Sequence, residues 1–130
     1  MSARVLVADD DVGARSLLVS ILRAAGFADI VQASDGARAL ALLREPTAFT
    51  LAFLDIDMPG FSGIEVLTLA KPCQPGCRWV LISANSAIDN VLAGMHAGAS
   101  GFVVKPYSMN KIDDVLVRCG ANGQAARTVP

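Results

Sequence analysis

Five polar side chains, each placed where a short apolar run ends, are the best candidates for chemistry in this 130-residue chain. They are Asp9, Asp10, Asp55, Ser83 and Lys105. Carboxylates bind hard divalent cations through oxygen, and both an ammonium group and a hydroxyl donate hydrogen bonds to phosphoryl oxygens. The set therefore indicates a site that holds a metal ion together with a phosphoryl group.

The acidic residues predict a magnesium site. Carboxylates that converge repel one another unless a cation neutralises them, and Mg²⁺ favours octahedral oxygen coordination in which one or two carboxylates and several waters take part. We expect Asp10 and Asp55 to bind the ion directly and Asp9 to act through a water. The turn after Asp55 also offers the main-chain carbonyl of Asp57. Mn²⁺ is a second candidate for the same oxygen ligands.

Asp55 is also the candidate nucleophile and phosphoacceptor. An aspartate forms an acyl phosphate when a donor is held in line with it and the charge on the phosphoryl oxygens is neutralised. Lys105 would supply positive charge for those oxygens, and Ser83 would supply a hydroxyl donor. The acids would thus bind the metal while the lysine and the serine bind phosphate.

The apolar runs before these residues are typical of buried strands in a parallel sheet. They are short, rich in valine, leucine and isoleucine, and lack alternation, as expected for strands covered on both faces. The expected strands are Val5–Ala8, Ile30–Ala33, Leu51–Leu54, 79–83 and 101–105. Ligand sites of such sheets lie beyond the carboxyl ends of the strands, which is where all five polar residues fall.

Segments with helical spacing separate the strands. The expected helices run from about Val12 to Ala25, from a cap at Ser34 or Asp35 to before Pro46, from Gly63 to before Pro72, from about Ala87 to Ala97, and from about Asn110 to Cys119. Alternation of strands and helices predicts an α/β fold. We expect a flavodoxin-like, doubly wound, five-stranded parallel sheet in the order 2-1-3-4-5, with five helices forming a three-layer sandwich.

Apolar positions at helical spacing predict which helix faces are buried. The expected inward residues are Leu17, Leu18, Ile21 and Leu22 in the first helix, Ala39, Leu40 and Leu43 in the second, Ile64, Leu67 and Leu69 in the third, Ile88, Val91, Leu92 and Met95 in the fourth, and Ile112, Val115, Leu116 and Cys119 in the fifth. We interpret Met95 and the Ile88 stripe as core and not as a partner surface.

Length and charge narrow the class of protein. The chain suits one domain, expected over residues 1–120, with 121–130 as a flexible tail or the start of a linker. A net charge of -1 without a run of lysine or arginine argues against direct binding to nucleic acid. No apolar run reaches the roughly 20 residues of a membrane span, and no signal-peptide pattern is present. We therefore expect a cytoplasmic protein that binds neither nucleic acid nor membrane.

Three cysteines, an odd number, do not suggest a disulfide framework. Cys73 and Cys77 flank a Pro-Gly turn, but a zinc site normally needs four ligands and the only histidine, His96, lies on a separate expected helix. Free thiols are the simpler interpretation, and the sequence indicates no role for them.

Four motifs in order resemble the receiver domain of bacterial two-component response regulators, and in particular the single-domain, chemotaxis-like type. They are VLVADDD at the first strand, FLDIDMPGFSGIE around Asp55, VLISA at the fourth strand and AGASGFVVKPY at the fifth. The resemblance implies that a histidine kinase or phosphotransfer protein donates a phosphoryl group to Asp55. It implies no turnover enzyme, only phosphorylation of the chain itself and slow self-dephosphorylation.

The resemblance also implies a switch. Ser83 would move toward the phosphoryl group and Phe102 would turn inward behind it, which would shift the surface formed by the fourth helix, fifth strand and fifth helix. That surface would control an output protein or a fused effector domain, and it is also a candidate dimer interface. The peptide bond between Lys105 and Pro106 is expected to be cis.

Two positions match those that the family links to the lifetime of the phosphoryl group. They are Asp57 and Asn85, two residues after the phosphoacceptor and two after the switch hydroxyl. Many family members have threonine at the position of Ser83, and serine retains the hydroxyl. The net effect of the acidic Asp57 cannot be deduced from charge alone.

Two other functions compete. Asp55-Ile-Asp57 with a later Ser83 and Lys105 resembles the haloacid dehalogenase phosphatases, but their Asp-x-Asp follows the first strand, whereas here an acidic pair comes first. A pseudo-receiver that only binds proteins is the other alternative, although all five site residues are present. The sequence does not distinguish a stand-alone regulator from a receiver excised from a larger protein, and it identifies neither the kinase nor the output partner.

Overall fold

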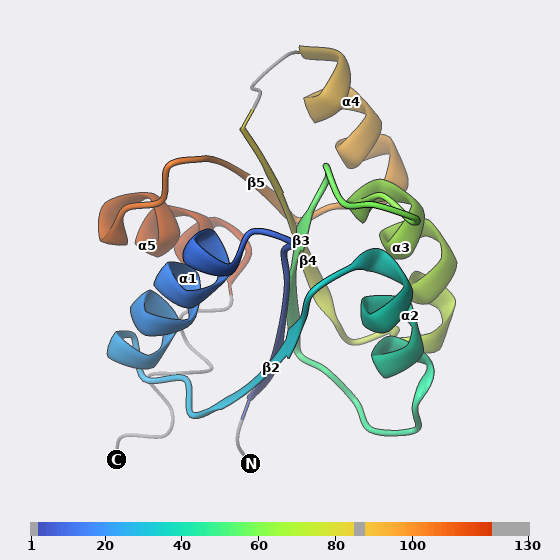
Figure 1. Ribbon diagram of the computed structural model, residues 1–130, viewed down its shortest axis with the longest axis horizontal. Helices are drawn as coiled ribbons and strands as arrows, with labels where there is room; N and C mark the ends of the chain where they lie inside the picture. Colours follow the sequence, from blue (N-terminus) through green and yellow to red (C-terminus); the bar gives the residue numbers. More distant parts are fainter. Residues whose placement is uncertain (1–2, 85–87, 121–130) are drawn as a thin grey trace.

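A five-stranded parallel sheet forms the centre of the molecule (Figure 1). The structure is a computed structural model, and it describes residues 3–84 and 88–120. The strands are β1 (Arg4–Ala8), β2 (Asp29–Ala33), β3 (Leu51–Asp55), β4 (Arg78–Ser83) and β5 (Gly101–Val104). Their spatial order is β2-β1-β3-β4-β5, and all neighbours pair in parallel. The predicted flavodoxin-like fold is confirmed.

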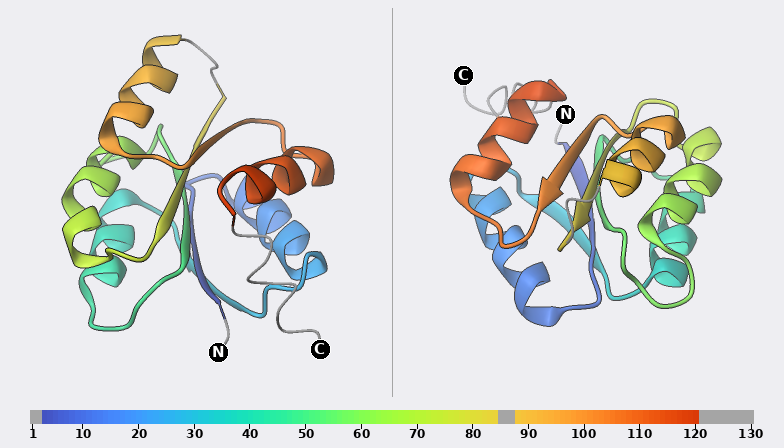
Figure 2. Two further views of the ribbon diagram at one scale, coloured as in Figure 1. Left: turned by 180° about the vertical axis from the view of Figure 1, so that it is seen from behind. Right: turned by 90° about the horizontal axis from the view of Figure 1, so that it is seen from above.

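Helices cover both faces of the sheet. They are α1 (Val12–Ala24), α2 (Gly36–Arg44), α3 (Gly63–Ala70), α4 (Ile88–Ala97) and α5 (Met109–Arg118), and the short 3-10 helix η1 (Lys71–Cys73) follows α3. Helices α1 and α5 lie on one face, and α2, α3 and α4 lie on the other (Figures 1 and 2). The observed start and end of each helix lie within about two residues of the predicted ones. The predicted start of the fourth helix, Ala87, lies outside the described residues.

Polar side chains start the helices where the sequence places them. Asp11 caps α1 by accepting hydrogen bonds from the amides of Gly13 and Ala14, and Asp35, one of the two predicted candidates, caps α2. Ser62 and Glu65 form a reciprocal capping box at α3. Because these caps satisfy amides that lack partners inside a helix, they fix where each loop ends.

Two apolar layers form the core. One lies between the sheet and α1 and α5 and includes Val7, Phe53 and Leu116. The other lies between the sheet and α2 and α3 and includes Leu54 and the only tryptophan, Trp79. Strand β3 is buried along its entire length, so both of its faces carry apolar side chains, as its continuous apolar sequence predicts.

Four residues predicted to face the core are exposed, and those predictions were wrong. They are Leu17, Leu69, Leu92 and Met95. Leu17 lies at the edge of the stripe on α1, whose buried residues begin at Leu18, and it lines a pocket with Lys105 and Tyr107. Only about a third of a helix surface faces the sheet. Apolar residues at the edges of a wider apolar face therefore remain exposed.

The fourth helix departs furthest from prediction. It packs against the sheet at the buried Gly94, where an added Cβ atom would lie 2.5 Å from Cδ1 of Leu81. Met95 is 65% exposed and Leu92 is 49% exposed, whereas Val91 is partly buried. At Gly94 the helix meets the sheet through a small residue, and Leu92 and Met95 lie on its exposed side.

Gln74 is a buried polar residue that the sequence pattern did not reveal. Its Nε2 donates to the carbonyls of Leu43, at 2.9 Å, and Thr47, at 3.2 Å, and its Oε1 accepts from the amide of Phe49 at 2.9 Å. These hydrogen bonds join the segment after η1 to the last turn of α2 and to the loop between α2 and β3. They satisfy backbone groups that would otherwise be buried without partners.

Gly63 lies where the start of α3 approaches the end of β3. A Cβ atom at this position would lie 2.5 Å from the main-chain oxygen of Asp55 and 2.8 Å from its carbonyl carbon. Neither atom belongs to a flexible side chain, so the backbone itself would have to move. The end of β3 can therefore lie close to the start of α3 only because residue 63 has no side chain.

We predict that Gly63→Ala lowers the free energy of unfolding by about 1–3 kcal/mol, the usual cost of forcing extra volume into a packed region. Urea unfolding followed by the fluorescence of the buried Trp79 measures this loss. Gly76→Ala is the matched control, since nothing lies within 4 Å of its added Cβ. Equal stabilities of the two variants would contradict the prediction.

Candidate functional site

Strand register brings the predicted site residues to one edge of the sheet. Ala8 lies opposite Leu54, so the acidic residues that follow β1 lie beside Asp55 at the end of β3. Asp55 pairs with Ile82, the residue before Ser83. Ser83 in turn pairs with Val104, the residue before Lys105. The five predicted residues therefore come from the carboxyl ends of four neighbouring elements of the sheet.

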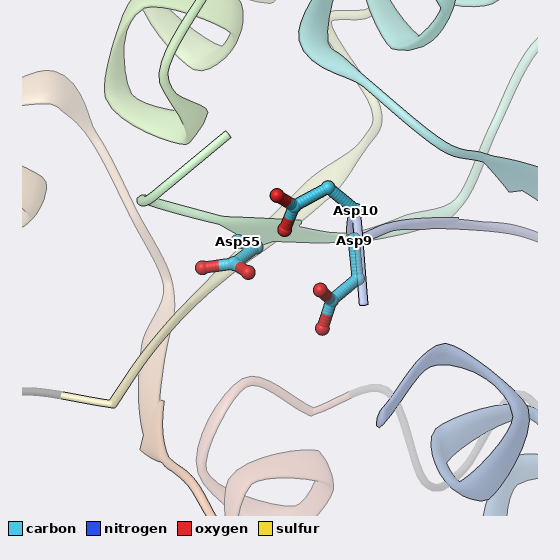
Figure 3. Close-up of side chains that lie close together, drawn as sticks. All are labelled: Asp9, Asp10 and Asp55. Atoms are coloured by element: carbon cyan, nitrogen blue, oxygen red, sulfur yellow. The ribbon is translucent and has the colours of Figure 1, made fainter. Parts of the chain in front are cut away.

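Three carboxylates converge at this edge. Asp9 and Asp10 extend from the end of β1 and Asp55 from the end of β3 (Figure 3). One carboxylate oxygen from each residue lies within 4.8 Å of the others. Asp9 and Asp55 are buried, whereas Asp10 is exposed. Three hard oxygen donors at this spacing, two of them shielded from water, fit a divalent cation such as Mg²⁺.

Lys105 is the cation that the chain itself places among these acids. Its Nζ lies 3.0 Å from Oδ2 of Asp55 and 3.0 Å from Oδ2 of Asp9. The peptide bond between Lys105 and Pro106 is cis. One ammonium between two buried carboxylates leaves the site with excess negative charge, which attracts a further cation.

The electrostatic environment of Asp55 combines opposing effects. The pKa of Asp55 is raised to about 6 overall, mainly by burial and to a smaller extent by the neighbouring Asp9. The amide of Asp57, which donates to Oδ1 of Asp55 at 3.0 Å, and the ammonium of Lys105 act in the opposite direction. Partial burial lowers the pKa of Lys105, but its hydrogen bonds to Asp55 and Asp9 outweigh this effect and raise the pKa overall.

Ser83 lies beside Asp57 and is fully buried. Its Oγ donates to Oδ2 of Asp57 at 3.5 Å, near the upper limit for a hydrogen bond. Asp57 is exposed. The hydroxyl predicted to contact a phosphoryl group thus already contacts a carboxylate.

Tyr107 is a site residue that the sequence analysis missed. Its hydroxyl donates to Oδ2 of Asp9 at 3.2 Å, and its ring is buried in the core beside α1 and α5. Burial, followed by the negative charge of Asp9, raises the pKa of Tyr107 above its usual range, so the phenol stays a neutral donor. A tyrosine after Lys-Pro was the only available signal.

Arg15 on α1 also holds Asp9 in place. Its Nη1 donates to the main-chain oxygen of Asp9 at 2.7 Å, and its Nε donates to Gln32 of β2 at 3.2 Å. The guanidinium therefore ties the end of β1 to both neighbouring elements. A lone arginine on an expected helix did not indicate this contact.

The remaining candidates lie away from the carboxylates. Phe102 on β5 is partly buried and lines a pocket with Val91, Met95 and Val115. Asn85 lies outside the described residues. Cys73 is exposed, whereas Cys77 is buried and burial raises its pKa to about 12. Within residues 3–84 and 88–120, the acidic triad is the only group of three or more His, Cys, Asp or Glu side chains spaced to hold a metal ion.

We predict that Asp55→Asn stabilises the metal-free protein at pH 7 by on the order of 3 kcal/mol. A carboxyl whose pKa is raised from 3.8 to about 6 binds its proton more tightly in the folded state. Wild-type stability therefore falls as the pH rises from 4 to 6, while the amide variant lacks this loss. The stability difference should vanish below about pH 4 and be constant above about pH 6.

Urea unfolding in a chelator across this pH range measures the difference. Asp113→Asn, which removes an exposed carboxylate on α5, is the control for loss of a carboxylate outside the site. A wild type more stable than Asp55→Asn at pH 7 would contradict the assigned cause, since it would mean that the ionised carboxylate is favoured by folding.

Sequence comparison matches residues 5–117 to the response regulator receiver domain. The transcriptional regulatory protein PrrA of Mycobacterium tuberculosis is 37% identical over 113 residues, which cover 85% of this chain and 47% of PrrA. The response regulator protein FleR of Pseudomonas aeruginosa is 32% identical over 118 residues, covering 91% of this chain and 24% of FleR. The chain thus spans about half the length of PrrA and less of FleR.

Solved structures agree in fold. A CheY-like receiver domain protein from Methanospirillum hungatei superposes with a TM-score of 0.83 at 24% identity, covering 98% of this chain and 99% of that one. The CheX-CheY-BeF3-Mg complex from Borrelia burgdorferi contains a chain that matches with a TM-score of 0.81 at 30% identity, covering 88% of this chain and 87% of that chain. The match of residues 5–117 to the receiver domain and the similarity to PrrA show that the chain belongs to the response regulator receiver domain family of two-component systems.

Proposed function

We propose that this chain is a phosphoacceptor switch of a two-component phosphorelay, in which Asp55 receives a phosphoryl group from a histidine kinase or phosphotransfer protein. The observation that carries the proposal is the placement of Asp55, which is buried beside two further carboxylates and has the Lys105 ammonium 3.0 Å from its Oδ2. A nucleophilic carboxylate needs such a setting, because both the phosphoryl oxygens and the attacking oxygen are negative.

In the proposed site, Asp10 and Asp55 bind Mg²⁺ directly, Asp9 acts through a water, and Asp57 offers its main-chain carbonyl. The bound ion would neutralise negative charge on the phosphoryl oxygens. The burial of Asp9 supports its indirect role, because both of its oxygens already accept hydrogen bonds from the protein. Asp10, which is exposed, is the more accessible ligand. Mn²⁺ would satisfy the same oxygen donors.

The transfer itself is a displacement at phosphorus. An oxygen of Asp55 forms the new P–O bond while the P–N bond to the donor histidine breaks, and the histidine leaves with the electron pair and takes up a proton. Lys105 and Ser83 would hold the phosphoryl oxygens. The similarity to the Borrelia protein solved with BeF3 and Mg supports this arrangement.

Ser83 and Phe102 would couple phosphorylation of Asp55 to the surface of the molecule. Ser83 must exchange Asp57 for a phosphoryl oxygen, and the pocket beside Phe102 leaves space for its ring to move. A shift of α4, β5 and α5 would follow, since packed elements change between discrete arrangements. The exposed Leu92 and Met95 lie on α4, so the change would alter an apolar surface that a partner, or a second copy of the chain, can bind.

The controlled partner is either a separate output protein or an effector domain in the same polypeptide. The names of PrrA and MtrA, a transcriptional regulator and a DNA-binding response regulator, illustrate the second arrangement.

Asp57, and Asn85 by its position, would set the lifetime of the phosphoryl group. We expect slow self-dephosphorylation without turnover of other substrates, and a cytoplasmic location. No helix among the described residues is long and apolar enough to span a membrane.

We predict that the purified chain, incubated with acetyl phosphate and Mg²⁺, gains one phosphoryl group, seen as one shifted band on a phosphate-affinity gel. A chelator and the Asp55→Asn substitution should each abolish the band, because the first removes the cation and the second removes the nucleophile. Asp113→Asn is the control, since it removes an exposed carboxylate on α5 without touching the site. It should be phosphorylated like wild type.

A band that persists in Asp55→Asn would refute Asp55 as the phosphoacceptor. Continuous hydrolysis of a generic phosphate ester would instead indicate a phosphatase. A protein that takes no phosphoryl group from acetyl phosphate or from kinases would indicate a pseudo-receiver that acts only by binding.

A further inference from the structure

Tyr107 brings a second side chain from the β5–α5 segment to Asp9, in addition to Lys105. It is the only tyrosine of the chain. Its ring belongs to the core layer beside α1 and α5, and 8% of the residue is exposed. A tyrosine side chain has few rotatable bonds, so a ring held in a core fixes its hydroxyl in space. That hydroxyl lies 3.2 Å from Oδ2 of Asp9.

The surroundings of Asp9 leave its side chain fully engaged. Oδ1 accepts from the amide of Asp11 at 2.9 Å and from Lys105 at 3.3 Å, while Oδ2 accepts from Lys105 and from Tyr107. Its main chain is held separately, by the guanidinium of Arg15 and by a bond from its amide to the carbonyl of Ala33. The orientation of the carboxylate therefore depends on Lys105, Tyr107 and one amide.

Lys105 and Tyr107 differ in whether they can keep donating to Asp9 when a cation binds. Lys105 is shared between Asp9 and Asp55, and in the proposed function it must also contact the phosphoryl group. A divalent cation near Asp9 would repel the Lys105 ammonium, because both are positively charged. The hydrogen bond from Lys105 to Asp9 is therefore weakened when the cation binds. The phenol of Tyr107 is neutral, so it can donate to Asp9 with or without a cation beside it.

We propose that Tyr107 is a positioning residue of the metal site, whose hydroxyl holds the Asp9 carboxylate in the direction needed to receive a divalent cation. This inference rests on the proposed function. Groups that hydrogen-bond to the residues around a metal commonly influence metal affinity as strongly as some ligands do. The residue would therefore act on metal binding before any phosphoryl transfer takes place.

The competing explanation is that Tyr107 only fills the core. Phenylalanine would then serve equally well, because it keeps the ring and removes only the hydroxyl. Tyr107→Phe separates the two explanations, since the substitution preserves packing. Thr50→Val is the matched control, because Oγ1 of Thr50 also donates one hydrogen bond, 3.2 Å long, to a carbonyl, that of Arg4 at the start of β1, away from the site.

The test is a titration of the 130-residue chain with Mg²⁺ alone, followed by the NMR signals of the Asp10 and Asp11 amides. The amide of Asp11 donates to Asp9, so it reports the direction of that carboxylate even without metal. We expect Tyr107→Phe to shift the Asp11 signal in the metal-free protein and to weaken Mg²⁺ binding by about tenfold. Thr50→Val should leave both unchanged.

Two results would overturn the inference. One is a Mg²⁺ affinity of Tyr107→Phe equal to or greater than that of wild type, and the other is an equal loss in Thr50→Val, which would reflect general destabilisation. Urea unfolding followed by Trp79 verifies that both variants are folded. A wild type that binds no Mg²⁺ would instead refute the metal site of the proposed function, and the role of Tyr107 with it.

Discussion

The repulsion among Asp9, Asp10 and Asp55 is the constraint around which this molecule is organised. Two of the three carboxylates are buried, and burying a charge is costly unless other groups compensate for it. The chain supplies that compensation from many directions, through Lys105, Tyr107 and the amides of Asp11 and Asp57. The compensation is incomplete, since the pKa of Asp55 remains raised. A site that the protein alone does not balance is suited to binding a cation and a phosphoryl group in turn.

The fold and the main site residues could be predicted because both depend on short-range patterns. Continuous apolar runs identify strands buried on both faces, and parallel strands bring the residues after their carboxyl ends to one edge. Once the strand order was right, Asp9, Asp55 and Lys105 had to lie together. The helix starts at Asp11 and Asp35 were predictable for the same reason, because a cap depends on nearby residues.

What the sequence did not reveal depends on distances between elements that are far apart along the chain. Periodicity marks the apolar side of α4, but it does not show that Gly94 carries the contact with Leu81 and leaves Met95 exposed. Tyr107 looks like an ordinary loop aromatic until the β5–α5 segment is placed beside Asp9. Gln74 was missed because a polar residue is usually exposed, and its partners lie 25 to 31 positions away in the sequence.

The hydrogen bonds of Gln74 lie at the end of the sheet opposite the carboxylates. They connect the segment after η1 to the carbonyl of Leu43, at the carboxyl-terminal end of α2, and to the loop that leads into β3. These segments precede β3 and β4, so they lie at the amino ends of those strands, and the carboxylates lie at the opposite end. In the proposed switch, a displacement that begins at Asp55 would therefore start at the end of the sheet that Gln74 does not cross-link. We expect such a displacement to leave the amino ends of β3 and β4 in place.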